Sequence, residues 1–494
     1  MDINTFHCHD LKTIAKPGMG KILVTGATGY IGGRLVMELL QRGYRVRVML
    51  RSIKYDLKER WPGAEIVIAD AMNPKELQKA LKGIHAAFYL IHSLLLGPKK
   101  FESADIEAAI NFKSAAESEN IKRIIYLGGL GDKDTDLSPH LKSRLMVAQE
   151  LQKGKVPVTI LRAAIIIGSG SASYEIINNL VKNSLVIFNP FWAKTKCQPI
   201  CIRDIMKYLV GVLEISKTKG QSFDIGCEDI LTYEKMLKIQ AELLGKKRLF
   251  LPSIISNTNV FSYILSFLTP VPAPIIRSLM EGLKNDVICQ DNDIIKYLPF
   301  KPISYRESLL RAMTRDQQDQ TRTRWTDSYP PSHELAIKLS ERIEIIKYKY
   351  SASIYTAKSR SAIYRSISRI GGKEGWHYSN WLWTLRGVID RIILGVGISR
   401  GRRSTSNLRV NDVIDFWRVE ALELNKKVLL RAEMKLPGLA WLEFIIKKEG
   451  YQNLFMVNAY FHTRSIIGKL YWNLTKPFHY FIFNYMIREI EKKS

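Results

Sequence analysis

The chain has few cysteines and no long uninterrupted apolar run. Its 494 residues include five cysteines at irregular spacings, without a CxxC pair. This argues against a disulfide framework and fits a reducing, cytoplasmic compartment. The longest uncharged stretch, residues 249–276, contains four prolines and is therefore a poor candidate for a membrane-spanning helix. Its 260–268 portion remains able to lie on a membrane surface or to line an apolar pocket.

Several functional signatures are also missing. No apolar segment follows a basic cap near the N-terminus, so we expect no signal peptide, and Met1 and Met19 are both candidate starts. The sequence contains no repeat, metal-ligand spacing, Ser-His-Asp arrangement or nucleotide-hydrolysis loop. We therefore expect no metal ion, and the function has to be sought in other features.

Negative charge is scarce relative to positive charge. Lys plus Arg number 74 against 47 Asp plus Glu, a net charge of +27. Residues 331–494 hold 28 basic and 14 acidic residues, which is more than half of the excess. This balance favours polyanionic partners, among them an anionic membrane surface with peripheral attachment. Nucleic acid is not favoured, because no recognisable nucleic-acid-binding motif accompanies the charge.

Short apolar runs alternate with amphipathic stretches from residue 21 to residue 161. This alternation predicts a doubly wound, parallel Rossmann-type α/β sheet with helices on both faces. We place the domain built on this sheet, with a substrate lobe, at residues 20–314, after a leader at 1–19 that has no predicted order. A polar segment at 315–345 that includes Pro330-Pro331 is predicted to be a linker.

The last part of the chain has a different pattern. Between residues 413 and 461, four alternating runs are separated by short turns, which predicts antiparallel hairpins. On the run 427–436 we expect Leu430, Ala432 and Met434 to be buried and the residues between them to be wet. The segment 466–490 reads as one long C-terminal helix. Residues 346–494 are thus predicted to form an α+β domain whose sheet holds that helix around an apolar cavity.

A glycine-rich segment follows the first predicted strand and opens the first helix. Small residues at this position allow a tight turn close to a pyrophosphate, whose charge the helix N-terminus binds. The predicted contacts are Gly26, Thr28, Gly29, Tyr30, Ile31 and Gly32.

The cofactor form is predicted from the end of the second strand. An acidic residue there would select NAD(H), but this chain has Arg51, which pairs with a 2′-phosphate, so NADP(H) is favoured over NAD(H). Arg34 and Arg47 are possible assistants. Asp70 and Ala71 are placed to meet the adenine, with a helix cap as the alternative role of Asp70. His92 and Ser93 follow the fourth strand and point to the nicotinamide.

These residues carry a resemblance. The segments KILVTGATGYIGG, YLIHSL, RIIYLGGLG and LRAAIIIGSGSAS are similar to the NmrA-like branch of the atypical short-chain dehydrogenase/reductase superfamily. The segments DFWRVEAL, AEMKLPGLAWLEF and GKLYWNLTKPFH resemble a domain of unknown function, DUF2867. The resemblance implies a Rossmann fold, a bound NAD(P) and oxidoreductase chemistry.

The catalytic pattern departs from that resemblance. Short-chain dehydrogenases use a Tyr and a Lys four residues apart with a nearby Ser, and this chain has His140 and Arg144 instead. A histidine can move a proton near neutral pH, and an arginine can hold a ribose. We take this pair as the candidate catalytic residues, with Ser93, Ser171 and Tyr174 as conceivable helpers.

The leading hypothesis is an NADP(H)-dependent oxidoreductase acting on an apolar small molecule, quinone- or isoprenoid-like. The alternative is a non-catalytic NADP(H)-binding redox sensor or scaffold. In the second domain, the glycine- and arginine-rich runs 371–376 and 397–403 read either as an anion contact or as exposed basic loops. Eight aromatic residues read either as a pocket for a greasy ligand or as core: Trp376, Trp381, Trp383, Trp417, Trp441, Tyr471, Trp472 and Phe478. The substrate, the direction of hydride transfer and the oligomeric state are left open.

Overall fold

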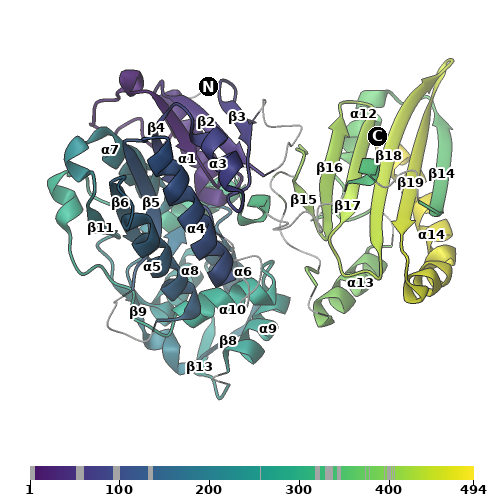
Figure 1. Ribbon diagram of the computed structural model, residues 1–494. Coiled ribbons are helices and arrows are strands. Elements are labelled where there is room, and N and C mark those ends of the chain that lie inside the picture. Colours follow the sequence, from purple (N-terminus) through teal and green to yellow (C-terminus); the bar gives the residue numbers. More distant parts are fainter. Residues whose placement is uncertain are drawn as a thin grey trace. The chain divides into compact units, whose positions relative to one another are not determined.

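The computed structural model places two compact units in the chain (Figure 1). The first comprises residues 1–268 and 273–331, and the second residues 269–272 and 332–494. The structure describes residues 6–51, 60–92, 101–131, 137–255, 257–317, 323–328, 338–341, 346–372, 374–377, 379–393, 395–397, 402, 404 and 407–494.

A parallel sheet of seven strands forms the centre of the first unit. Its order, β11-β6-β5-β4-β1-β2-β3, reverses direction between β1 and β4, as in doubly wound nucleotide-binding folds. The strands are β1 (Lys21–Val24), β2 (Arg45–Leu50), β3 (Glu65–Ile68), β4 (Ile84–Tyr89), β5 (Arg123–Gly129), β6 (Val158–Ala163) and β11 (Ser222–Ile225). The predicted Rossmann-type sheet is confirmed.

Helices cover both faces of this sheet. In β1, Ile22 and Val24 pack into one apolar cluster and Leu23 into the other, because successive side chains of a strand point to opposite faces. The first cluster includes residues of α1 (Tyr30–Gln41) and α7 (Ile202–Glu214), and the second includes residues of α3 (Pro74–Leu81), α4 (Phe101–Ser118) and α5 (Pro139–Gln152). Burial on both faces explains why these strands read as nearly continuous apolar runs.

A smaller lobe follows β6. Its helices are α6 (Ala172–Asn183), α8 (Tyr233–Leu243), α9 (Thr258–Leu268), α10 (Ala273–Gly282) and α11 (Tyr305–Gln317), and its short strands are β7 (Ile166–Ile167), β8 (Val186–Asn189), β9 (Lys196–Cys197), β10 (Ile200–Cys201), β12 (Leu231–Thr232) and β13 (Leu249–Pro252). Helix α8 begins at Tyr233, because Leu231 and Thr232 pair with β9 and the Thr232 side chain caps α8.

Residues 6–19, which the sequence suggested to be a leader, pack onto the first unit. Phe6, His7 and Cys8 are buried. The backbone N–H groups of His7 and Cys8 donate to the Glu38 carboxylate of α1 at 2.9–3.1 Å. This segment therefore belongs to the body of the first unit.

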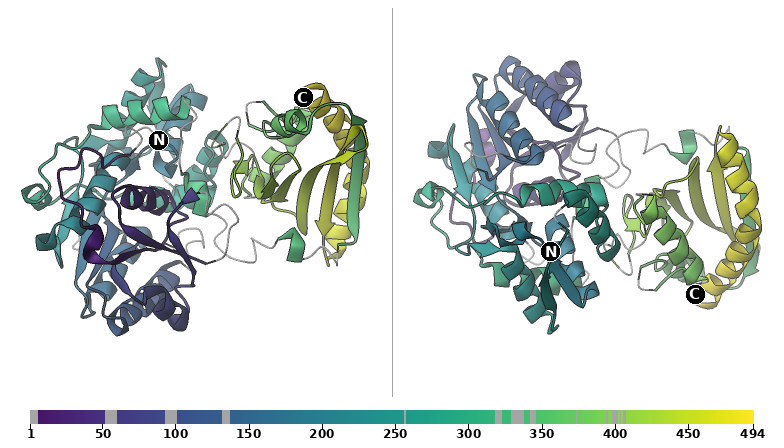
Figure 2. Two further views of the ribbon diagram at one scale, coloured as in Figure 1. Left: turned by 90° about the horizontal axis from the view of Figure 1, so that it is seen from above. Right: turned by 90° about the horizontal axis from the view of Figure 1, so that it is seen from below.

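The second unit is an antiparallel sheet of six strands with helices. The order is β14-β19-β18-β17-β16-β15, and the views of Figure 2 show the long α14 running along the sheet. Its elements are β14 (Tyr348–Thr356), α12 (Arg360–Ile367), α13 (Asn380–Ile392), β15 (Val413–Ile414), β16 (Trp417–Glu423), β17 (Lys427–Ala432), β18 (Leu439–Glu449), β19 (Gln452–His462) and α14 (Ile466–Lys492). The predicted antiparallel sheet and long C-terminal helix are confirmed.

Two details of the second unit differ from the sequence prediction. The run 413–424 is not one strand but a tight hairpin of β15 and β16, because Asp415 adopts a positive φ of 53°. Of the residues expected to be wet, Lys435 is exposed, but Arg431 is buried. The Glu433 side chain is 2% exposed and pairs with Arg418 at 2.5 Å. This second face of the sheet carries paired charges where water was expected.

No helix within the described ranges combines the length and the apolarity that a bilayer crossing requires.

Candidate functional site

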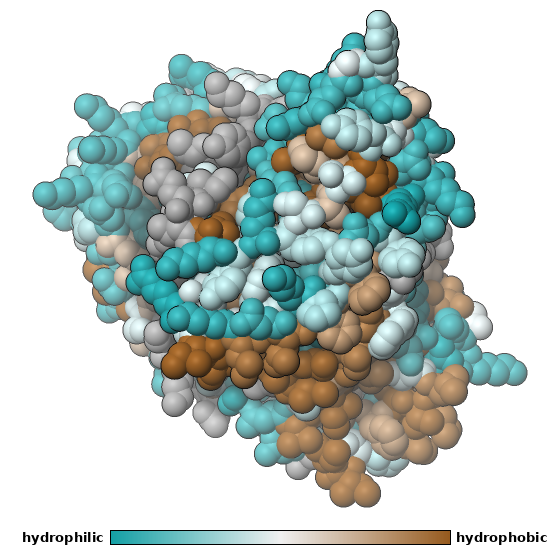
Figure 3. All heavy atoms as spheres, turned by 90° about the vertical axis from the view of Figure 1, so that its right-hand side faces the viewer, coloured by the Kyte–Doolittle hydropathy of each residue, from teal (hydrophilic) through white to brown (hydrophobic). Residues whose placement is uncertain are grey.

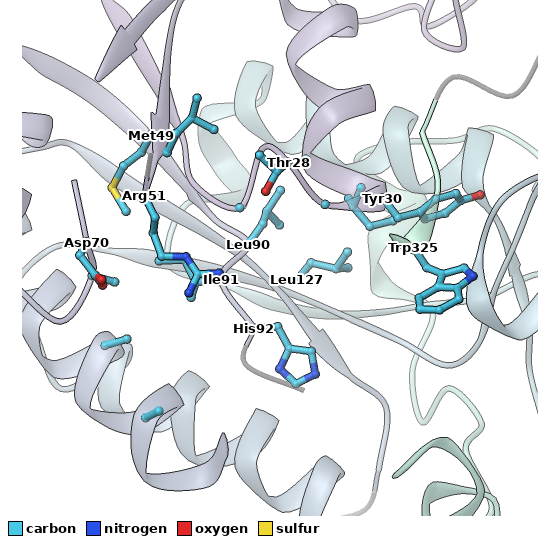
Figure 4. Close-up of a pocket in the computed structure, with 18 of the residues that line it drawn as sticks. Thr28, Tyr30, Met49, Arg51, Asp70, Leu90, Ile91, His92, Leu127 and Trp325 are labelled. Atoms are coloured by element: carbon cyan, nitrogen blue, oxygen red, sulfur yellow. The ribbon is translucent and has the colours of Figure 1, made fainter. Parts of the chain in front are cut away.

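A pocket of about 390 Å³ opens at the carboxyl ends of the central strands of the first unit (Figure 4). Loops after β1, β2, β3 and β4 line it, which is where open α/β sheets bind ligands. The predicted cofactor residues that line this one pocket are Gly26, Thr28, Gly29, Tyr30, Ile31, Gly32, Arg51, Asp70, Ala71 and His92. Ser93 lies outside the described residues.

The glycine-rich turn needs its glycines for steric reasons. Gly26 has a φ of 61°, and a Cβ atom there would lie 2.3 Å from the Leu90 carbonyl oxygen. A Cβ atom on Gly32 would lie 2.4 Å from the Gly26 carbonyl oxygen. The turn therefore passes close to the first turn of α1, whose N-cap Gly29 offers no side-chain hydrogen bond. Such a helix start leaves backbone N–H groups for an anion.

The pocket has a basic and an acidic group on its β2–β3 side. Arg51 extends from the end of β2 toward the centre of the pocket, and Asp70 lies beyond it after β3 (Figure 4). The Asp70 carboxylate accepts a hydrogen bond from the Met72 N–H at 2.9 Å. Asn73, not Asp70, caps α3. The helix-cap alternative for Asp70 was therefore wrong.

The two possible assistants of Arg51 are engaged elsewhere. Arg34 is buried and donates to backbone carbonyls of Tyr30, Thr323 and Ser169. Arg47 donates to the Glu65 carboxylate and to the backbone carbonyls of Ala80 and Lys82 at the C-terminal end of α3. Both guanidinium groups hold the fold together, so of the three arginines only Arg51 lines the pocket.

One lining residue comes from the segment predicted to be a linker. Trp325 is 8% exposed, lines the pocket and donates its backbone N–H to the Gly170 carbonyl. Nearby, Asp327 pairs with Arg60 at 3.0 Å. The polar composition of this segment concealed its role, and the lone tryptophan within it was the available signal. Figure 4 shows Trp325 beside Tyr30, on the opposite side of the pocket from Asp70.

A histidine cluster stands behind one wall of the pocket. His92 lines the pocket, and its Nδ1 lies 3.0 Å from the Asp105 carboxylate of α4. The Nε2 atom of His92 is buried without a hydrogen-bond partner in the described part of the chain. Burial lowers the pKa of His92 to about 4, an effect that the Arg144 charge strengthens and Asp105 opposes. His92 is therefore neutral at pH 7, with Nδ1–H directed to Asp105.

The predicted pair His140 and Arg144 is divided by the structure. Arg144 lines the pocket, whereas His140 does not. The His140 ring lies behind His92, with 5.1 Å between ring centroids. Burial and the nearby His92 and Arg144 hold the pKa of His140 well below its usual value. Reasoning from sequence missed Asp105, because a single acidic residue near the start of a helix carries no signal of its own.

The conceivable helpers after β6 have local structural roles. The Ser171 side chain caps α6 by accepting from the Tyr174 N–H, and both residues are buried. Their neighbour Ala172 lines the pocket instead.

A second, apolar cavity of about 100 Å³ lies in the lobe of the first unit. Helices α6, α8, α9 and α10 line it. The Trp192 indole is one of the few groups in this lining that can form a hydrogen bond. The Trp192 indole N–H is buried and has no partner among the described residues. Ala172 of α6 and Ile275 of α10 line the first cavity. The next residue of each helix, Ser173 or Ile276, lines the second cavity. The two cavities are therefore neighbours.

The glycine- and arginine-rich runs of the second unit, which the sequence suggested as an anion contact, have structural roles at the residues that the structure describes. Gly371 has a φ of 79°, and the Trp376 indole donates to Asp415 at 2.8 Å. Arg402 donates to the Ile370 carbonyl at 2.6 Å. Residues 373, 398–401 and 403 lie outside the described residues. Most of the eight aromatic residues are core, as in the stacked pair Trp376 and Trp383, but two are exposed, Trp381 and Phe478.

Comparison with known proteins adds the family. Residues 19–285 match the model of the NmrA-like family, and residues 346–486 match DUF2867, a protein family of unknown function. The photosystem II assembly factor Ycf39 of Trieres chinensis is 24% identical over 245 residues, 48% of this chain and 75% of that protein. The ceramide reductase of Caulobacter vibrioides is 25% identical over 247 residues, 47% of this chain and 74% of that protein.

Among solved structures, the Citrobacter sp. triphenylmethane reductase complexed with NADP(H) is 20% identical. It covers 59% of this chain and 99% of its own, with a TM-score of 0.48. The NmrA-like match spans just over half of the 494 residues and coincides with the sheet and pocket described above. The chain therefore belongs to the NmrA-like family of NAD(P)-binding, oxidoreductase-type proteins, and it joins this domain to a DUF2867 domain.

Proposed function

We propose that the protein is an NADP(H)-dependent oxidoreductase that interconverts an alcohol and a carbonyl group on an apolar small molecule. The observation that carries this proposal is the arrangement around one pocket. Arg51 stands on one side, the Asp105-bound His92 on another, and an apolar cavity adjoins it.

The residues of the pocket fit the cofactor. Its diphosphate would lie on the turn from Gly26 to Gly32, where any Cβ atom would fill the space between turn and helix. Arg51 would pair with the 2′-phosphate, and Asp70 lies on the side expected for the adenine. Arg144 would hold the nicotinamide ribose.

When bound, the nicotinamide supplies or accepts the hydride. The proton is the task of this chain's own residues. His92, neutral and with Nδ1–H held by Asp105, presents Nε2 as a base that takes the proton of a substrate hydroxyl during oxidation and returns it during reduction. His140 lies against His92 and away from the pocket, so its role is to support the His92 ring.

An apolar substrate is favoured by the second cavity. Its lining is aliphatic and aromatic, and the Trp192 indole N–H would donate to an oxygen of the ligand. One relative is named a ceramide reductase, which agrees with an apolar substrate.

The test is turnover by the purified full chain. We expect steady NADPH oxidation with a panel of long-chain aldehydes, ketones and quinones. His92→Gln should lower turnover by about 100-fold or more while NADPH binding persists. His85→Gln, in β4 but outside the pocket, should leave both unchanged. Tight NADPH binding without turnover of any panel member would favour the sensor alternative, which the missing Tyr and Lys also suggest. No binding of either coenzyme would contradict both.

A further inference from the structure

Helix α13 of the second unit presents apolar side chains outward and charged side chains inward. Trp381, Leu385 and Ile389 are 67%, 48% and 45% exposed, and their four-residue spacing puts them on one helix face. Asp390, in contrast, is fully buried and accepts from the backbone N–H groups of Gly397 and Lys435 at 2.7 Å. A helix that faces only water has the reverse pattern.

Helix α14 has a similar exposed apolar stripe over its first two thirds. Ile467, Leu470 and Leu474 are 71%, 59% and 64% exposed. The stripe continues past Pro477 to Phe478 and Phe481, which are also exposed. The opposite side of the helix packs on the sheet through residues such as Trp472 and Phe483. One side of α14 therefore completes the core, and the other is left apolar and uncovered.

The two stripes lie at the same end of the sheet. The loop between β17 and β18 contacts both helices: Arg386 of α13 donates to the Lys435 carbonyl at 2.8 Å, and Thr463, just before α14, donates to the Pro437 carbonyl at 2.7 Å. Figure 3 shows apolar side chains gathered toward the lower edge of the second unit. We name this surface the apolar end face; it consists of Trp381, Leu385, Val388, Ile389, Ile392, Ile466, Ile467, Leu470, Leu474, Phe478 and Phe481.

Positive charge flanks this surface. No Asp or Glu occurs between Glu449 and Glu489, whereas the same stretch contains Arg464, Lys469, Lys476 and Arg488, all exposed. An apolar face bordered by lysine and arginine, with aromatic side chains among the exposed apolar ones, is the composition of helices that lie in a membrane interface. The charge attracts anionic head groups, and the apolar face leaves water at the head-group boundary.

We infer that the apolar end face docks the second unit onto an anionic lipid membrane, with α13 and α14 lying in the interface. The apolar side chains supply the insertion, and the basic side chains supply the preference for anionic over neutral lipid. The inference is independent of the cofactor pocket, because all of its residues belong to the second unit.

Cosedimentation of the full chain with vesicles tests it. Vesicles of phosphatidylcholine with about a third phosphatidylglycerol should bind the protein, and pure phosphatidylcholine should bind it at least about tenfold more weakly. Added salt should weaken binding to the anionic vesicles. The double variant Leu470→Glu/Leu474→Glu should lower partitioning by about tenfold or more, since two apolar side chains are lost and two negative charges gained.

The matched control is Leu424→Glu, because Leu424 is 75% exposed but lies in the β16–β17 turn, at the other end of the sheet. This variant should bind vesicles like the parent. Unchanged circular dichroism and an unchanged urea-unfolding curve followed by tryptophan fluorescence verify that each variant folds. Equal binding of the double variant, or no binding to anionic vesicles, overturns the inference. A self-associated protein that the double variant dissociates, without lipid binding, overturns it in favour of an interface between two copies.

Discussion

The two units bury the apolar side chains of their sheets in different ways. The first buries both faces of a parallel sheet, so its strands read as apolar runs and its functional groups gather at the strand ends. The second buries one face of an antiparallel sheet in apolar contacts, and on the other face Arg418 and Glu433 pair. Exposed apolar side chains then cluster on two helices at one end of the sheet. The candidate functional residues of the first unit therefore line a cavity, whereas those of the second unit lie on an exposed apolar surface.

The largest expected effect concerns a glycine of the phosphate turn, which is found in the first unit. Gly32→Ala should lower NADPH affinity of the first unit by at least about 100-fold, because the new Cβ atom would lie 2.4 Å from the Gly26 carbonyl oxygen and displace the phosphate turn. Calorimetric titration measures the effect. Gly18→Ala is the control, since no atom lies within 4 Å of a Cβ atom there. Unchanged affinity in the Gly32 variant would show that the turn does not hold the cofactor.

Substitution of His92, the proposed acid–base residue, tests proton transfer separately from cofactor binding. His92→Gln should lower kcat by about 100-fold or more, with the NADPH dissociation constant within about threefold of the parent. Asp105→Asn should also lower kcat, because it removes the carboxylate that directs Nδ1–H, and this loss should be smaller. Steady-state kinetics on the best panel substrate gives both values. An equal loss of NADPH binding would mean that His92 contributes to binding and not to proton transfer.

The buried carboxylate of Asp390 in α13 is expected to stabilise the second unit alone. Asp390→Asn should lower the free energy of unfolding of that unit by about 2 kcal/mol, because an amide cannot accept from both the Gly397 and Lys435 N–H groups. Urea unfolding followed by tryptophan fluorescence reports this unit, which contains six of the nine tryptophans. NADPH affinity should not change. A loss of affinity would show that the two units are energetically coupled.

Cofactor preference rests on a single guanidinium of the first unit. Arg51→Ala should weaken NADPH binding by about tenfold while NADH binding stays within about twofold, since only NADPH carries the 2′-phosphate. Arg45→Ala, at the opposite end of β2, is the control. Competition titrations with both coenzymes measure the ratio. Equal weakening of both coenzymes would assign Arg51 to the shared diphosphate.

The smallest effect concerns pH. Burial lowers the pKa of His479 of α14 to about 4, so the folded second unit disfavours its protonation. The unfolded chain binds this proton below about pH 6.5, and the stability that the neutral form contributes is therefore lost as pH falls from 6.5 toward 4. His479→Phe should reduce the loss between pH 7.5 and 6 by about 1 kcal/mol. Parallel urea curves at the two pH values measure it, and identical slopes with pH would exclude His479.

Reasoning from sequence found the parts of the site that depend on local steric rules. The phosphate turn, Arg51, Asp70 and His92 all follow strands, and strand ends can be read from apolar runs. Trp325 and Asp105 could not be found in this way. Trp325 reaches the pocket only because its segment folds back onto α1 and α6, and Asp105 is defined only by the ring that it contacts.

In the second unit, the β16–β17 and β18–β19 hairpins were predicted because Asn425 and Gly450 allow the positive φ that tight turns require. The edge strand β14 was not, because its pairing with β19 joins segments about 100 residues apart. The prediction that Arg431 and Glu433 face water was wrong because alternation identifies two faces of a strand but not what covers each face.

The amino-acid sequence by itself determined the alternating strands and helices of the first unit, the hairpins of the second and the glycine turn, because these depend on side-chain periodicity and on backbone φ. Only the tertiary structure decided that His92 rather than His140 lines the pocket, and that α13 turns its apolar side outward. Both outcomes depend on which surfaces remain uncovered once distant segments have packed, and that is a property of the whole fold.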